Sequence, residues 1–262
     1  MAEKPVVIVT GASRGLGEAC ARWLASKECR LVVTARNAEG LRALRSELEE
    51  RGAEVLEVAG DVAESGACSG LVQKTLERFG RIDSLVNNAG VLAPVRQLAA
   101  ADPAEWAYNV AVNLLGPAYL MQAALPSLRQ SMGRIINVST GAAVQAIEGW
   151  SAYCASKAGL LHLSKVVSAE EKAVTVVSLR PGVIDTGMQE LIRRDGPGHM
   201  PAQMADYFQQ LKTTGQLEPP AVPGRALAWL ALFAPRGLNG EFLDYNDPRV
   251  QEPARREFGE GF

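Results

Sequence analysis

Residues that build metal centres and disulfide frameworks are scarce in this chain. Its 262 residues include four cysteines and two histidines. The cysteines stand far apart at positions 20, 29, 68 and 154, without a C-x-x-C pair, so we expect reduced thiols and no disulfide framework. His162 and His199 belong to no Cys/His cluster, and we therefore expect no metal site.

The sequence also lacks an excess of one charge and any long apolar run. Lysine and arginine total 27 and aspartate and glutamate total 29, for a net charge of -2. A balanced charge offers no electrostatic footprint for nucleic acid or an anionic membrane surface. No run of 18 apolar residues is present, so no segment is expected to span a bilayer. The first residues lack a signal-peptide pattern, and we expect a cytoplasmic protein.

What the chain does contain is a regular alternation of apolar strands with longer helical segments. Strands are predicted at 6–9, 31–34, 55–59, 85–87, 134–138, 174–179 and 241–243. Helices are predicted at 18–25, 38–51, 65–79, 106–121, 151–169 and 221–233. Strands that are continuously apolar indicate a parallel sheet buried on both faces. We therefore predict an α/β fold, a doubly wound parallel sheet of the Rossmann type in three layers.

One segment interrupts this alternation. Residues 185–220 mix glycine, proline, methionine and polar residues, and the stretch is too long for an ordinary connection. We predict that it forms a substrate lid. Because no linker or repeat is evident, residues 1–262 are predicted to form a single domain.

A glycine-rich turn follows the first strand. The sequence TGASRGLG at 10–17 has the spacing G-x-x-x-G-x-G between a strand and a helix. Such a turn lets backbone N–H groups and the helix N-terminus approach a pyrophosphate. The predicted cofactor-binding residues here are Gly11, Ser13, Arg14, Gly15, Leu16 and Gly17.

The same turn supports an alternative of another class. Residues 11–15 fit G-x-S-x-G, the nucleophile elbow of serine hydrolases, with Ser13 as the nucleophile. That hypothesis needs an acidic residue and then a histidine downstream. His162 and His199 are the candidates, and His162 falls within a predicted apolar helix.

The end of the second strand predicts which dinucleotide is bound. A carboxylate usually stands about 20 residues past the glycines to bind the ribose diol. Here the sequence is Thr34-Ala35-Arg36-Asn37, with no carboxylate. The guanidinium groups of Arg36 and Arg14 suit a 2′-phosphate, which favours NADP(H) over NAD(H).

Tyr153 and Lys157 stand four residues apart in the helix predicted at 151–169. That spacing places both side chains on one helix face. A neighbouring ammonium stabilises the phenolate and lowers the phenol pKa, so the pair can serve as acid in reduction and as base in oxidation.

Other polar residues fall at or near the carboxyl ends of strands, where open α/β sheets bind ligands. They are Asn87-Asn88-Ala89-Gly90, Asn113, Ser139, Thr140 and Arg180-Pro181-Gly182. Together with the Tyr–Lys pair they predict a single site at this edge of the sheet.

With these motifs the chain resembles the short-chain dehydrogenases/reductases over nearly its whole length. The resemblance implies that Tyr153 donates a proton and that Lys157 lowers its pKa and holds the nicotinamide ribose. Asn113 would anchor a water that relays protons to Lys157. The resemblance further implies cofactor contacts from Asn37, Asp61, Val62, Asn87, Ala89, Gly90, Pro181, Gly182, Val183, Ile184 and Thr186.

The family's active serine leaves an open choice in this chain. It usually lies thirteen residues before the tyrosine, where this chain has Thr140, while Ser139 lies fourteen before. Either hydroxyl can steady a substrate carbonyl, although the χ1 of threonine is stiffer. We predict that one of the two is essential and the other is not.

Within the family, the chain resembles sepiapterin reductase and the benzil-type diketone reductases. The resembling segments are GRIINVSTGAA, EGWSAYCASKAG, RPGVIDTGMQ and NGEFLDYNDP. We predict an NADPH-dependent reductase of ketones or vicinal diketones, with Trp150, Met188 and Asp244 on the substrate side. A pterin reductase that uses Asp244 is the alternative, and a non-catalytic NADP(H)-binding regulator is another. The resemblance also implies a homodimer or homotetramer formed through the helices at 104–131 and 151–170.

Overall fold

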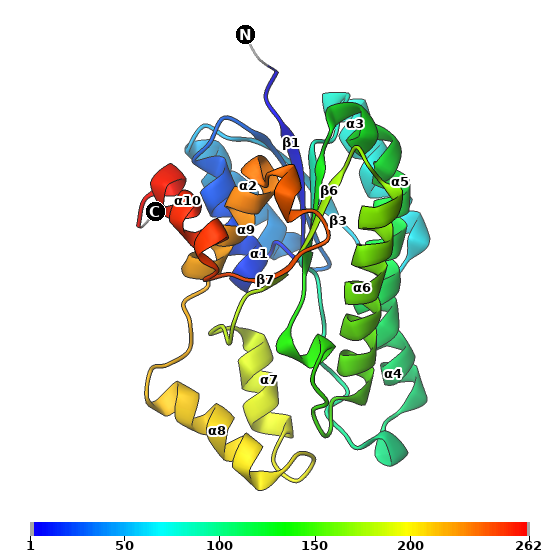
Figure 1. Ribbon diagram of the computed structural model, residues 1–262, viewed down its shortest axis with the longest axis vertical. Coiled ribbons are helices and arrows are strands. Elements are labelled where there is room, and N and C mark those ends of the chain that lie inside the picture. Colours follow the sequence, from blue (N-terminus) through cyan, green and yellow to red (C-terminus); the bar gives the residue numbers. More distant parts are fainter. Residues whose placement is uncertain (1–2, 261–262) are drawn as a thin grey trace.

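The computed structural model describes residues 3–260, so the two residues at each end of the predicted domain lie outside it (Figure 1). Its centre is a seven-stranded sheet whose neighbouring strands are all parallel. The strands are β1 (Val6–Thr10), β2 (Arg30–Ala35), β3 (Glu54–Ala59), β4 (Ser84–Asn87), β5 (Arg134–Val138), β6 (Thr175–Arg180) and β7 (Phe242–Asp244). Their order is β3-β2-β1-β4-β5-β6-β7, which confirms the predicted doubly wound sheet.

The apolar strands form this sheet because each one buries side chains on both faces. In β1, Val7 and Val9 belong to the core on one face, and Val6 and Ile8 belong to the core on the other. All four are fully buried. This explains why the strand sequences are continuously apolar and do not alternate with polar residues.

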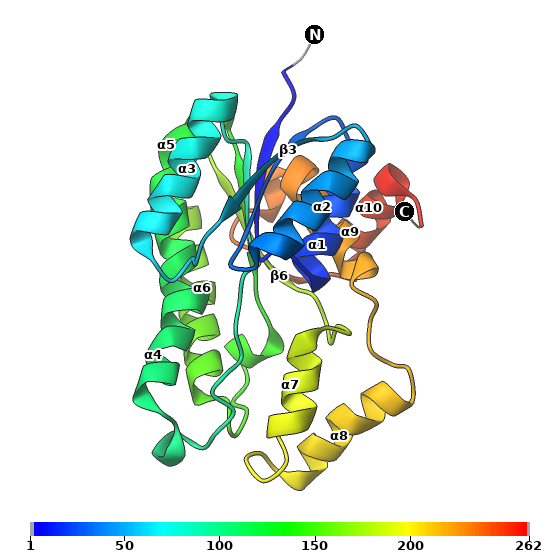
Figure 2. The ribbon, with the colours of Figure 1, turned by 180° about the vertical axis from the view of Figure 1, so that it is seen from behind.

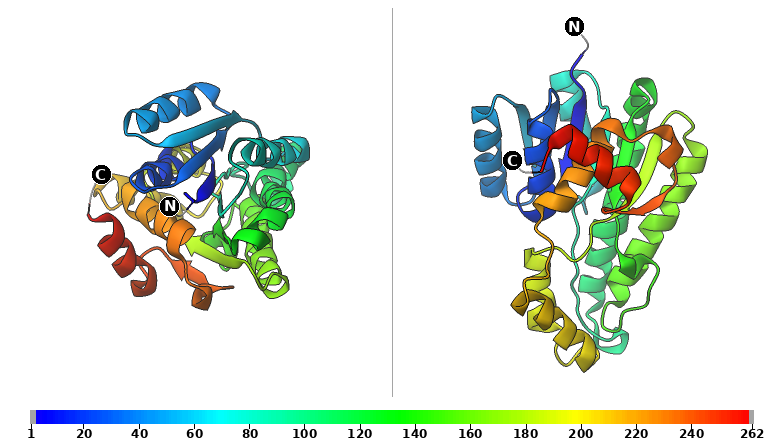
Figure 3. Two further views of the ribbon diagram at one scale, coloured as in Figure 1. Left: turned by 90° about the horizontal axis from the view of Figure 1, so that it is seen from above. Right: turned by 60° about the vertical axis from the view of Figure 1, so that its left-hand side comes forward.

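Helices cover both faces and complete the three predicted layers (Figure 3). One face packs against α1 (Gly15–Ala25), α2 (Ala38–Glu50), α9 (Ala221–Phe233) and α10 (Pro248–Phe258). The other face packs against α3 (Ser65–Phe79), α5 (Gly116–Ser131) and α6 (Ser151–Glu170). Short 3₁₀ helices lie at η1 (Leu98–Ala100), η3 (Gly141–Ala143) and η4 (Arg236–Leu238). Among the described residues, no helix is both long enough and apolar enough to cross a membrane.

The predicted lid segment is largely helical. It contains α7 (Gly187–Asp195) and α8 (Ala202–Thr213), which stand beyond the carboxyl ends of the strands (Figure 1; Figure 2). An isolated parallel bridge between Ile184 and Glu218 holds the two ends of the segment together. The segment therefore leaves the sheet and returns to it at one place.

The helix predicted at 106–121 is in fact three consecutive helical pieces. They are α4 (Pro103–Val110), a π-helical turn η2 (Ala111–Leu115) and α5. Asp102 caps α4 by accepting from the backbone N–H of Ala104. A π-turn inside a helix is often found at a functional site, and Asn113 stands in this one.

Candidate active site

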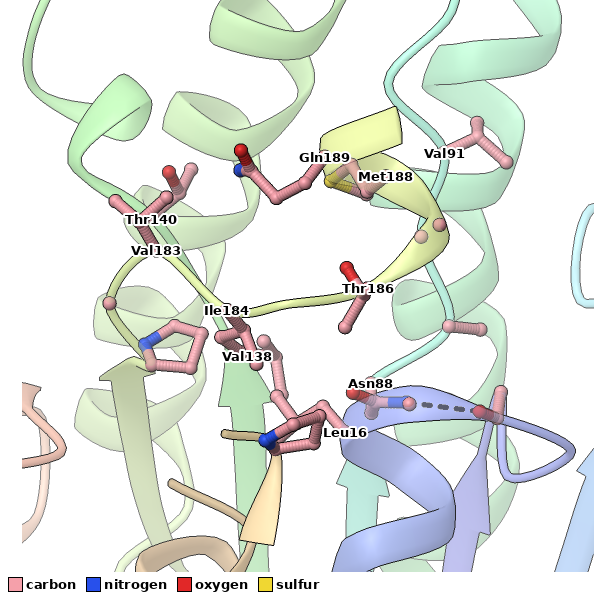
Figure 4. Close-up of a pocket in the computed structure, with 18 of the residues that line it drawn as sticks. Leu16, Asn88, Val91, Val138, Thr140, Val183, Ile184, Thr186, Met188 and Gln189 are labelled. Carbon is pink, nitrogen blue, oxygen red and sulfur yellow. Dashed lines mark hydrogen bonds between the residues drawn. The ribbon is translucent and has the colours of Figure 1, made fainter. Parts of the chain in front are cut away.

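A cavity of about 1170 Å³ opens at the carboxyl ends of the strands, beneath α7. The order of the strands reverses between β1 and β4, and this reversal creates a crevice for a ligand. Figure 4 shows the cavity wall formed by the β5–α6 and β6–α7 connections and the first turn of α1. Most of the predicted site residues line it: Gly11, Ser13, Arg14, Gly15, Leu16, Arg36, Asn37, Asp61, Val62, Ala89, Gly90, Ser139, Thr140, Trp150, Tyr153, Lys157, Pro181, Gly182, Val183, Ile184, Thr186, Met188 and Asp244.

The glycine turn has the geometry of a phosphate cradle. Gly11 and Gly15 have φ of 64° and 60°, a conformation that side chains rarely adopt. Arg14 stands at the N-cap position of α1, and its side chain makes no hydrogen bond to the backbone N–H groups of the first turn. Those N–H groups are therefore available to an anion. These features fit the pyrophosphate of a dinucleotide.

Gly17 does not line the cavity, contrary to its predicted role in cofactor binding. A Cβ at this position would lie 2.4 Å from the carbonyl oxygen of Gly11 and 2.5 Å from Nδ2 of Asn88. Gly17 therefore allows α1 to pack closely against the turn, which is a role in packing.

The end of β2 places a cationic group beside the cavity. Arg36 is exposed, lies over the Tyr108 ring and donates to its hydroxyl. Tyr108 in turn donates to Oδ2 of Asp61 at 2.7 Å. Asn37 is the N-cap of α2 and accepts from the backbone N–H of Gly40. No motif in the sequence points to Tyr108, which lies on α4, far along the chain from Arg36.

Asn87 is not part of the cavity wall, contrary to the prediction. Its side chain is buried and donates to Oδ1 of Asn137 on the neighbouring strand at 2.8 Å. The next residue, Asn88, lines the cavity and donates to the backbone oxygen of Thr10 at 2.8 Å. Asn88 thus ties β4 to the glycine turn.

Tyr153 and Lys157 both point inward from α6 and are almost fully buried. The Nζ of Lys157 lies 5.9 Å from the Tyr153 ring centre and donates to the backbone oxygen of Val138 at 2.8 Å. Burial raises the pKa of Tyr153 to about 12, and burial lowers the pKa of Lys157 to about 8. Desolvation dominates the tyrosine pKa, and the group that lowers it is Thr140 and not Lys157 as expected.

Thr140, and not Ser139, contacts the tyrosine. The Thr140 side chain lowers the tyrosine pKa and so partly offsets the effect of burial, which places its hydroxyl close to the phenol. The Thr140 hydroxyl also accepts from the backbone N–H of Ala142 at 3.2 Å, which orients it. Ser139 is buried, and its Oγ has no partner among the described residues. The geometry thus favours Thr140 in the choice that the sequence leaves open.

Asn113 lies behind the cavity wall, and its side chain is fully occupied. Its Oδ1 accepts from the backbone N–H of Val91, and its Nδ2 donates to the Val91 carbonyl and to Oδ1 of Asn109. The side chain holds the connection after β4 against η2. Asn113 does not line the cavity, and its expected role as the anchor of a water next to Lys157 stays a prediction.

The wall opposite the glycine turn is mainly apolar. Trp150 stacks on Phe208 of α8 with ring centres 5.7 Å apart, and it meets Tyr153 edge-on at 5.9 Å. Met188 and Ile192 from α7 extend the same surface. This arrangement places α7 and α8 over the Tyr153 side chain.

Asp244 lines the cavity at the end of β7, but its carboxylate is paired with the guanidinium of Arg180.

Two other residues line the cavity with polar side chains. Thr186 is the N-cap of α7, yet its hydroxyl does not cap the helix. Gln189 is 7% exposed and lines the cavity; it ends the segment RPGVIDTGMQ, but its type and spacing alone did not point to a role.

The hydrolase alternative finds no support in this arrangement. Ser13 lines the cavity, but neither His162 nor His199 does. His162 is exposed on α6. Without a histidine beside Ser13, the turn has no general base for a serine nucleophile.

Comparison with known proteins agrees with this geometry. The family described as short chain dehydrogenase matches residues 5–196. A benzil reductase ((S)-benzoin forming) of Saccharomyces cerevisiae is 37% identical over 259 residues, covering 94% of this chain and 97% of the relative. Sepiapterin reductase of Bos taurus is 33% identical over 263 residues, covering 93% and 95%.

Solved structures agree as well. A short chain dehydrogenase/reductase from Saccharomyces cerevisiae superposes with a TM-score of 0.90 at 36% identity, covering 95% of this chain and 98% of the other. A metagenomic short-chain oxidoreductase in complex with NADP has a TM-score of 0.66 at 39% identity, covering 70% and 84%. The chain therefore belongs to the short-chain dehydrogenase family and is an oxidoreductase of CH–OH and C=O groups that uses a nicotinamide cofactor.

Proposed function

We propose that the protein is an NADPH-dependent carbonyl reductase that reduces a ketone or a vicinal diketone, and that also oxidises the alcohol product. The observation that carries the proposal is that Thr140 and Tyr153 lie together under an apolar wall, in the same cavity as the phosphate cradle. A carbonyl bound at this pair would lie between a proton donor and the cofactor position.

Two arginines support the choice of NADP(H). Arg14 and Arg36 line the cavity beside Ser13 and Asn37, and the two residues directly after β2, Arg36 and Asn37, carry no carboxylate. Guanidinium groups bind phosphate with directed, charge-assisted hydrogen bonds, so this corner suits a 2′-phosphate. A relative of known structure was solved with NADP. When bound, the cofactor supplies the hydride.

Tyr153 supplies the proton. With a pKa of about 12, its hydroxyl stays protonated at neutral pH and can donate to the carbonyl oxygen. Thr140 binds the same oxygen and orients the carbonyl. Lys157 is charged below a pH of about 8, and its ammonium stabilises the phenolate left after proton transfer.

The apolar wall supports an aromatic or otherwise hydrophobic substrate. Trp150, Met188, Ile192 and Phe208 present rings and flexible thioether and alkyl groups, which suit planar apolar ligands. The benzil reductase among the relatives carries out a reaction of this kind.

The pterin alternative has less support. It requires the Asp244 carboxylate to bind an amino group of the substrate, but this carboxylate is paired with Arg180. A pterin substrate would have to compete with a guanidinium. We therefore place the pterin second to the diketone.

The test is NADPH oxidation with a panel of ketones, diketones and sepiapterin, with NADH in parallel. We expect turnover of diketones by the wild type and its loss in Tyr153→Phe, while NADPH affinity is retained. Tyr119→Phe is the matched control, because Tyr119 lies outside the cavity. Cofactor binding without turnover on any substrate would instead support the regulator, and preferred turnover of sepiapterin would support the pterin reductase.

A further inference from the structure

Gln189 presents an unpaired amide inside the cavity. It stands in the first turn of α7, directly after Met188, and it is 7% exposed. Its Oε1 is buried without a hydrogen-bond partner, and among the described residues no partner is found for its Nε2. Figure 4 shows the amide extending from α7 toward the side of the cavity where Thr140 lies.

A buried amide without partners is costly, so its presence in a ligand cavity needs an explanation. The amide nitrogen is the atom turned toward the Thr140 side of the cavity, so a ligand that accepts a hydrogen bond there gains a neutral donor that has no other partner in the described part of the chain (Figure 4). An amide is also neutral and can turn either its donor or its acceptor toward a ligand. It therefore suits an uncharged polar group.

Its surroundings restrict that group further. Met188, Ile192 and Phe208 form apolar surface near it, and Thr140 and Tyr153 occupy the other side of the cavity. The reacting carbonyl binds at Thr140 and Tyr153. Because the Gln189 amide extends toward the Thr140 side of the same cavity, it is placed to meet a second polar atom of the molecule whose carbonyl binds at Tyr153.

We propose that Gln189 determines specificity for substrates with two adjacent carbonyl groups, by donating from Nε2 to the oxygen that is not reduced. The inference rests on the proposed function and narrows its substrate class from ketones in general to vicinal diketones. Hydride reaches the carbon of the first carbonyl, the Tyr153 proton reaches its oxygen, and the second carbonyl stays intact in the hydroxyketone product. Gln189 thus binds substrate and product alike and fixes which carbonyl meets the tyrosine.

Trp150 is the other group that could bind the second oxygen. Its Nε1 is also buried without a partner in the described part of the chain, and its ring lines the cavity. Gln189 is favoured because its amide lies at the end of a flexible side chain. Trp150 is held between Phe208 and Tyr153.

The test compares benzil with deoxybenzoin, which has the same carbon skeleton but a single carbonyl. In Gln189→Met we expect kcat/KM for benzil to fall roughly tenfold, the effect of one lost hydrogen bond. The value for deoxybenzoin should stay near that of the wild type, and NADPH affinity should not change. Gln203→Met is the matched control, because Gln203 is an exposed glutamine on α8 that does not line the cavity.

The other outcomes separate the possible failures. An equal fall for both ketones, with weaker NADPH binding, would assign Gln189 to the cofactor and overturn the inference. An unchanged Gln189→Met together with a benzil-selective loss in Trp150→Phe would assign the role to Trp150 and also overturn it. In both cases the proposed function stands. A wild-type enzyme that reduces neither ketone would overturn the proposed function and the inference together.

Discussion

Burial governs the chemistry of the individual side chains at the site. Tyr153 and Lys157 keep the positions expected from their spacing. Desolvation favours the neutral form of each group, so it raises the pKa of Tyr153 and lowers the pKa of Lys157. The sequence could not show whether Ser139 or Thr140 supplies the active hydroxyl. A shift of one residue in the turn after β5 decides which of the two faces the tyrosine. Tyr108 was not predictable, because it reaches the site through folding and not through a motif. Gln189 ends the segment RPGVIDTGMQ, but the sequence does not show that its side chain faces the cavity.

The contact between Thr140 and Tyr153 predicts which hydroxyl is essential. Thr140→Ala should lower kcat by roughly 100-fold, as expected when a donor to the carbonyl oxygen is removed. Ser139→Ala should change kcat little, because its hydroxyl does not contact the tyrosine. Steady-state kinetics of both variants with a diketone checks this, and equal, mild losses would refute the assignment.

The lowered pKa of Lys157 predicts a cost in stability. In the unfolded chain the lysine titrates near 10.5, and in the folded protein near 8, so its buried charge destabilises the fold by roughly 3 kcal/mol below pH 8. That cost shrinks as the pH rises from about 8 to 10.5, because the folded protein has then already released the proton.

Lys157→Met should therefore be inactive yet more stable than the wild type at pH 7. Its advantage in free energy of unfolding should diminish toward pH 10.5. Urea unfolding at several pH values measures this difference. A variant that is less stable than the wild type at pH 7 would contradict the account.

Among the elements, the strands were the best predicted, because most of them are short runs rich in valine, isoleucine and leucine. Helices with few apolar residues were missed. The buried side chains of α7 are Gln189 and Ile192, and those of α10 are Val250 and Ala254, so neither sequence shows a broad apolar stripe. The π-turn η2 was also missed, since its residues continue the helical pattern on either side.

The turn from β2 to α2 determines cofactor choice if Arg36 binds the 2′-phosphate. Arg36→Leu should raise KM for NADPH by roughly 10- to 100-fold, the effect of losing a hydrogen bond to a charged group, and should leave KM for NADH nearly unchanged. Arg42→Leu, an exposed change on α2, is the control and should affect neither. A similar rise for both cofactors would show that Arg36 does not read the phosphate.

At the scale of the whole molecule, the single sheet gathers motifs that are distant in sequence into one cavity, as the fold class predicted. The face formed by α5 and α6 is left partly apolar. It has a shallow hollow of about 470 Å³ lined by Tyr119, Leu125 and Leu163, and Val166 nearby is exposed. The expected oligomer and the expected cytoplasmic location remain predictions.

We expect this face to join copies of the chain into a homodimer or homotetramer. Leu163→Asp places a charge in the hollow and should yield a monomer of 27.9 kDa, whereas the wild type should have two or four times that mass. Leu98→Asp, at an exposed site on η1, is the control. Light scattering after size-exclusion chromatography measures the mass, and a monomeric wild type would contradict the prediction.

The central claim is that hydride passes from NADPH to a carbonyl carbon in this cavity. The most direct measurement uses NADPH deuterated at both C4 positions, with benzil as the substrate and mass spectrometry of the product. The account predicts a hydroxyketone with one deuterium on the carbinol carbon, formed by the wild type and not by Tyr153→Phe. A product without deuterium, or equal product from both proteins, would contradict it.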